Sequence, residues 1–127
     1  MSIKSVAVVV AHGLVGWALC GGTMGVAMKM TTLGTALIVH AMAAPVIFAA
    51  VSLIYFHGVA SWSPLRTAAA FVVVVVVMDF FVVALLIEQS FKMFESILGT
   101  WLPFVLIFIS TWWTGLAVRR AAHRAAV

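Results

Sequence analysis

Four long apolar stretches dominate the sequence and limit the folds that it can adopt. They cover residues 5–28, 33–56, 65–88 and 96–118. A helix needs roughly 20 apolar residues to cross the hydrocarbon layer of a bilayer, and each stretch is long enough. None of them alternates polar and apolar residues with a period of two, as a lipid-facing β-strand would. The sequence therefore predicts four transmembrane helices.

The composition excludes most soluble classes of protein. Charged residues make up only 8% of the chain, whereas a soluble domain has about 25%. So few charges cannot solvate the surface of a 13.6 kDa globule. A soluble enzyme, a disordered tail and a disulfide scaffold are excluded. The net charge of +4 reflects the scarcity of acids, so we expect the lipid bilayer, and no nucleic acid, as a partner.

The links between the stretches are short, which indicates how the helices are arranged. Short links favour antiparallel neighbours, so we expect an all-α, up-down-up-down four-helix bundle in the membrane. Residues 1–127 then form a single domain. The first stretch runs on to Met28, longer than the apolar region of a typical signal peptide, so we expect it to be retained as a helix.

The basic residues near the ends of the stretches predict the orientation. Two of them, Lys29 and Lys92, fall on one side of the membrane, and the other five fall on the side of the termini. Basic residues are enriched on the cytoplasmic side. We therefore expect a multi-pass protein of the cell (inner) membrane with both termini cytoplasmic. The five residues are Lys4, Arg66, Arg119, Arg120 and Arg124.

Three polar residues fall at similar depths in the outer half of the predicted bundle. At a rise of about 1.5 Å per residue, Asp79, Cys20 and His40 lie about 4, 5 and 7 Å outward from the midplane. An ionisable group in hydrocarbon is costly and is by default a candidate for function. We expect His40 and Asp79 to interact, with Cys20 at the same level, as a substrate or proton site. The alternative is an interhelical hydrogen bond that only holds the bundle together.

A second polar layer is expected on the inner side of the midplane. His12 falls about 7 Å inward by the same count, level with three hydroxyl residues of the fourth helix. These are Ser110, Thr111 and Thr114. His12 is then either a hydrogen-bonded packing residue or an axial haem ligand.

Sulfur ligands supply a second possible cofactor site on the first helix. Cys20, Met24 and Met28 recur every four residues and could bind Cu(I), although Met is also an ordinary core residue. The cofactor stays unknown, with haem and Cu(I) as alternatives.

Two sequence features bear on helix packing. Gly21 and Gly25 form a Gly-x-x-x-Gly pattern, which is typical of close helix–helix contact in membranes. Pro45 removes one backbone donor inside the second helix, which frees the carbonyl of Ala41 and predicts a kink.

Three functions are compatible with these features. The first is a proton- or cation-coupled transporter or channel subunit that uses His40 and Asp79. The second is a non-catalytic subunit or assembly partner of a larger membrane complex, and the third is a haem- or metal-binding redox protein. The sequence has no nucleotide-binding, nucleophile-elbow or zinc-protease motif, which argues against an enzyme. Four helices are few for enclosing a path, so we expect a homo-oligomer or a larger complex.

Overall fold

The computed structural model describes residues 2–58, 62–87, 89–90 and 92–126, and these are helical apart from short links. Four segments are long and apolar enough to cross a membrane, which confirms the four predicted spans. The elements are α1 (Ile3–Met30), α2 (Leu33–Gly58), α3 (Pro64–Met78), η1 (Asp79–Ile87), η2 (Lys92–Glu95), η3 (Ile97–Trp101) and α4 (Leu102–Ala126).

Two of the spans differ from their predicted form. The third is α-helical only from Pro64 to Met78 and continues as a π-helix, η1, over Asp79–Ile87. The fourth extends to Ala126 instead of ending at residue 118. Alanine and arginine are strong helix formers, and cations are favourable near a helix C-terminus, which accounts for the extension.

Serine residues cap three of the helices. The side chains of Ser2 and Ser63 accept hydrogen bonds from backbone N–H groups in the first turns of α1 and α3, and Ser96 does the same for η3. Pro64 follows its cap at the first turn of α3, where the absence of an N–H costs nothing. The polar links of the sequence thus satisfy the helix ends.

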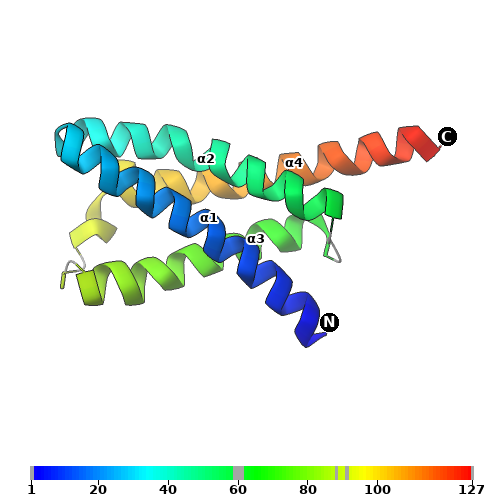
Figure 1. Ribbon diagram of the computed structural model, residues 1–127, viewed down its shortest axis with the longest axis horizontal. Helices are drawn as coiled ribbons and strands as arrows, with labels where there is room; N and C mark the ends of the chain where they lie inside the picture. Colours follow the sequence, from blue (N-terminus) through cyan, green and yellow to red (C-terminus); the bar gives the residue numbers. More distant parts are fainter. Residues whose placement is uncertain (1, 59–61, 88, 91, 127) are drawn as a thin grey trace.

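The helices alternate in direction, and both termini lie at the same end of the bundle (Figure 1). We call this the terminal end. The order of neighbours differs from the prediction, because α1 and α4 each pack against both α2 and α3. The consecutive helices α2 and α3 therefore lie diagonally across the bundle, as do α1 and α4.

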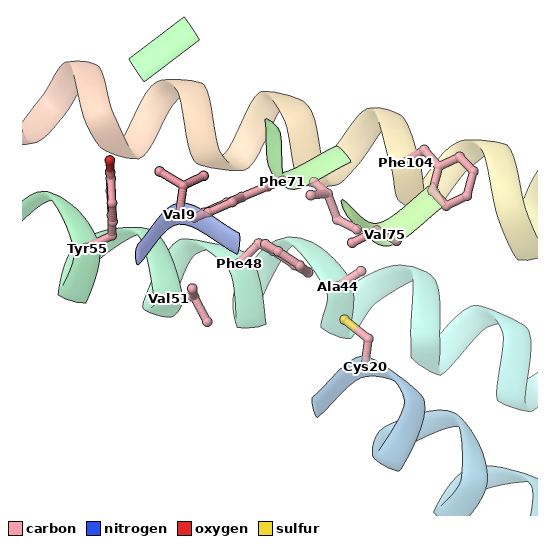
Figure 2. Packing of buried hydrophobic residues seen from close by; sticks show 10 residues of the cluster. Val9, Cys20, Ala44, Phe48, Val51, Tyr55, Phe71, Val75 and Phe104 are labelled. Atoms are coloured by element: carbon pink, nitrogen blue, oxygen red, sulfur yellow. The ribbon is translucent and has the colours of Figure 1, made fainter. Parts of the chain in front are cut away.

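Aromatic side chains fill the centre of the bundle. Phe48 and Tyr55 of α2 and Phe71 of α3 are fully buried. The ring centroid of Phe71 lies 5.7 Å from that of Phe48 and 6.1 Å from that of Tyr55. Figure 2 shows these rings together with Cys20 of α1 and Ala44 of α2, which belong to the same cluster. Large rings thus bridge the distance between the diagonal helices α2 and α3.

The glycines that allow close packing are different from the two predicted. A Cβ atom at Gly16 would lie 2.5 Å from Cζ of the buried Phe48, and one at Gly13 would lie 3.2 Å from Val74 of α3. In contrast, a Cβ atom at Gly21 or Gly25 would have nothing within 4 Å. Among the described residues, α1 thus approaches its neighbours at Gly13 and Gly16 and not at Gly21 or Gly25.

We expect Gly16→Ile to destabilise the bundle by about 1–3 kcal/mol, the usual range for overpacking a core. Phe48 is fully buried and has no room to move away. The matched variant Gly25→Ile should change stability by no more than about 0.5 kcal/mol, as an exposed position does. Thermal unfolding of the monomer in detergent measures both. Equal losses for the two variants would contradict this packing of α1.

Candidate polar site at Asp79

The carboxylate of Asp79 is held by an indole from the first helix. Trp17 Nε1–H donates a hydrogen bond to Asp79 Oδ1 at 2.9 Å, and both residues are half-buried. Asp79 lies within the third apolar span and Trp17 within the first. A carboxylate away from water needs hydrogen-bond donors, and this bond joins two neighbouring helices of the bundle.

The packing of α1 brings Trp17 to this position. Gly13 and Gly16, which pack against α3 and α2, directly precede Trp17 along the chain. Residues three and four positions apart lie on one face of a helix, so Gly13 and Trp17 share the side that faces α3. The small glycines let α1 approach closely enough for the indole to reach the carboxylate.

Asp79 also marks the point where the third span changes its backbone pattern. Its N–H donates to the carbonyl oxygens of both Val75 and Val76, and the π-helix begins at this residue. The segment ends near Gln89, whose φ of 53° lies in the left-handed region. Single π-helical segments inside α-helices occur often at functional sites. Asp79 thus lies at the position where the α-helix changes to the π-helix.

Cys20 lies in the same part of the structure. It is buried with 5% of its surface exposed, and its thiol is close enough to the Asp79 carboxylate for an electrostatic interaction. Cys20 is three residues after Trp17, so both project from α1 toward the beginning of η1. The structure thus brings together Trp17, Cys20 and Asp79.

The expected pairing of His40 with Asp79 stays a prediction. His40 belongs to α2 and Asp79 to the third span, and these two segments are diagonal. Nδ1 of His40 is buried and has no hydrogen-bond partner among the described residues. The expectation assumed that consecutive helices are neighbours, whereas α2 and α3 are diagonal.

The expected contact between His12 and the hydroxyl residues of α4 also stays a prediction. His12 and the hydroxyl residues of α4 lie on the diagonal helices α1 and α4. Nδ1 of His12 donates to the carbonyl oxygen of Val8 at 2.8 Å, because a carbonyl can only accept. The imidazole packs edge-on against Tyr55 of α2, with centroids 5.3 Å apart. His12 therefore contacts the backbone of its own helix, α1, and a side chain of the neighbouring helix α2.

The hydroxyl residues of α4 face other neighbours. Ser110 Oγ donates to the carbonyl oxygen of Pro45 at 2.6 Å, which joins α4 to α2. Thr111 is fully buried, and its hydroxyl has no partner among the described residues. Thr114 is half-buried. Pro45 lies inside the continuous helix α2. The hydrogen bond from Ser110 to its carbonyl oxygen joins this part of α2 to α4.

Binding of a metal ion requires a group of side chains that can act as its ligands. Within the described ranges, no three His, Cys, Asp or Glu side chains are grouped closely enough to hold a metal ion. Haem bound by one histidine and Cu(I) bound by Cys20 with Met24 and Met28 need other ligand sets, and they stay predictions.

Sequence reasoning missed Trp17 as the partner of Asp79, although a signal was present. Tryptophans of membrane helices gather near the two interfaces, whereas Trp17 falls near the middle of the first span. An indole N–H at that depth needs an acceptor, and Asp79 is the single carboxylate of the sequence at a similar depth.

Comparison with protein-family models, with curated proteins and with solved structures finds no match to this chain. The functional argument therefore rests on the geometry around Asp79.

We expect Trp17→Phe to destabilise the protein by about 1–3 kcal/mol, because the Asp79 carboxylate loses a donor that water does not replace. The control is Trp113→Phe, which changes an indole that is 66% exposed and should have little effect. In an Asp79→Leu background, Trp17→Phe should cost much less. Unfolding of the wild type, Trp17→Phe, Asp79→Leu and the double variant in detergent gives the coupling energy. A coupling near zero would contradict the contact.

Proposed function

We propose that this protein is a subunit of a proton- or cation-coupled transporter or channel in the membrane, and that Asp79 is the group that takes up and releases the ion. The observation that carries the proposal is the hydrogen bond from Trp17 to a carboxylate inside an apolar span, at the beginning of a π-helix. The five basic residues near the terminal end support an orientation with both termini in the cytoplasm.

The chemistry of the donor favours ion binding. An indole N–H holds one carboxylate oxygen in place without neutralising its charge. Ionisable side chains within membrane spans are costly and commonly mark the pathways of protons and ions. A residue that only joined two helices would need no ionisable group, since an amide would accept the same hydrogen bond. The ionisable carboxylate of Asp79 is therefore the part of this contact that supports a role in ion binding.

The backbone at this site also supports the proposal. The π-helical segment alters the regular hydrogen-bond pattern beginning at Asp79. Irregular backbone at membrane depth is tolerated where it is buried in protein or lines a polar path, and ion sites in transporters are commonly built at such interruptions. Because four helices are few for enclosing a path, we propose that the active form contains further copies or further subunits.

A second candidate is a non-catalytic subunit that docks into a larger membrane complex. It is favoured by the surface of α1 toward the end opposite the termini. Gly21 and Gly25 are uncovered there, and Ala18, Gly22 and Val39 line an adjacent groove of about 670 Å³. Small residues at a helix surface permit a second helix to approach closely.

Proton and cation flux in reconstituted vesicles tests the transport proposal. Vesicles that contain the protein and a pH-sensitive dye are placed under a potassium diffusion potential, and sodium uptake is measured in parallel. We expect flux in the wild type, and we expect Asp79→Asn to abolish it because an amide cannot ionise. Glu95→Gln is the matched control at an exposed carboxylate and should keep the flux.

Two results would contradict the transport proposal. One is a wild type that conducts no better than empty vesicles, and the other is an Asp79→Asn variant with unchanged flux. Thermal unfolding of each variant distinguishes loss of ion binding from loss of structure.

A further inference from the structure

The terminal end of the bundle contains a cavity of about 320 Å³ between the end of α2, the beginning of α3 and α4. Small-molecule sites range from about 300 to 1,000 Å³, so the cavity can hold a small polar group. Its lining includes Phe56, Trp62, Ser63, Arg119 and Ala122. It thus combines aromatic surface, a hydroxyl and a guanidinium.

The cavity is closed toward the interior of the bundle. Gly115 of α4 lies directly against α2 and α3, since a Cβ atom there would be 2.6 Å from Pro64 Cβ and 2.8 Å from Phe56 Cζ. Pro64 is buried, whereas Arg119 and Ala122 are exposed. A ligand therefore enters from the terminal end and stops at the layer formed by Gly115.

A second guanidinium, outside the cavity lining, contacts Trp62. Arg66 lies over the indole of Trp62, with its central carbon 4.8 Å from the ring centroid, and Trp62 is part of the lining. Arg66 Cζ is held there by a cation–π contact. The N-terminus of α3 begins beside the cavity at its cap, Ser63, and its helix dipole adds positive potential.

The chain supplies little negative charge to balance these groups. Its three acidic residues are Asp79, Glu88 and Glu95. Asp79 lies inside a span, and Glu95 lies in η2 between the third and fourth spans, at the end opposite the termini. Among the described residues, no carboxylate lies at the terminal end, where the sequence places five lysines and arginines. An anion from outside the chain is the natural counter-charge.

The position of the cavity along the helices indicates which anion. Arg119 follows directly after the last apolar residue of the fourth predicted span, and α4 projects beyond the other helices at this end (Figure 1). Trp62 and Trp113 lie toward the same end, where aromatic residues mark the interface of a membrane protein. The cavity is thus at the level of the lipid headgroups.

We propose that this cavity binds the phosphodiester headgroup of an anionic phospholipid. Arg119 and Arg66 contact the phosphate oxygens, Ser63 provides a polar wall, and Phe56 and Trp62 pack against the glycerol and the upper acyl carbons. Basic pockets between helices on the cytoplasmic side of a membrane bind such headgroups. The site does not depend on the transport proposal, because neither Trp17 nor Asp79 takes part.

Retention of lipid by the purified full-length chain tests the site. The protein is extracted into detergent, supplied with equal amounts of phosphatidylglycerol and phosphatidylcholine, and analysed by native mass spectrometry. We expect preferential retention of phosphatidylglycerol. Arg119→Gln should reduce it about tenfold, the effect of losing one charge-assisted hydrogen bond. Arg124→Gln removes the same charge from the same helix outside the cavity lining and should leave retention almost unchanged.

A pair of added carboxylates gives a second test at neighbouring positions. Ala122→Glu places a negative charge in the cavity lining, whereas Ala121→Glu places it on the adjacent residue outside the lining. Both residues are exposed, and glutamate is a strong helix former, so both variants should fold. We expect Ala122→Glu alone to abolish the preference for phosphatidylglycerol.

Three outcomes would overturn the proposal. Equal losses in the paired variants would show that the lipid responds only to total charge. Equal retention of the two lipids by the wild type would show that no anionic headgroup is selected. Displacement of phosphatidylglycerol by inorganic phosphate at millimolar concentration would show that the cavity holds free phosphate instead of a lipid.

Discussion

The close approach of α1 to the aromatic centre of the bundle determines the position of the main polar contact. Gly16 lies against Phe48 and Gly13 against Val74, so α1 packs on two helices at once. A side chain at Gly16 would overlap Phe48, and one at Gly13 would require Val74 to shift by a few tenths of an ångström. Trp17 follows Gly16 directly and would lose its 2.9 Å hydrogen bond to Asp79. The lack of a side chain at Gly13 and at Gly16 therefore allows Trp17 to reach Asp79.

The order of the helices around the bundle explains which polar residues meet. Trp17 of α1 and Asp79 at the beginning of η1 are joined by a hydrogen bond. The expected pairs of His40 with Asp79 and of His12 with the α4 hydroxyls each join diagonal helices. Large aromatic rings occupy the space between the diagonal helices. Equal depth therefore does not by itself predict which polar side chains meet, because the order of the helices around the bundle also matters.

Features of the fold that follow from the bilayer thickness can be predicted from the sequence. Features that depend on how side chains of different volume pack together cannot. Four spans follow from the length of the apolar stretches, since each backbone must satisfy its hydrogen bonds within lipid. The similar depth of Cys20 and Asp79 follows from the helical rise. The diagonal placement of α2 and α3 depends on how Phe48, Phe71 and Gly16 fit together. The π-helix beginning at Asp79 has no marker in the sequence, because valine, leucine and phenylalanine surround it as they do elsewhere in the spans.

The few charged residues of the chain differ in position according to their sign. Asp79 lies within the apolar layer, where the chain itself supplies the donor from Trp17. The arginines and Lys4 lie near the terminal end, where the described part of the chain has no carboxylate to oppose them. A cation at a lipid surface costs little because water and headgroups solvate it. A carboxylate inside the layer has no such surroundings, so its cost must be offset by a specific residue. This difference explains why these basic residues are exposed, whereas Asp79 is held by a hydrogen bond from a neighbouring helix.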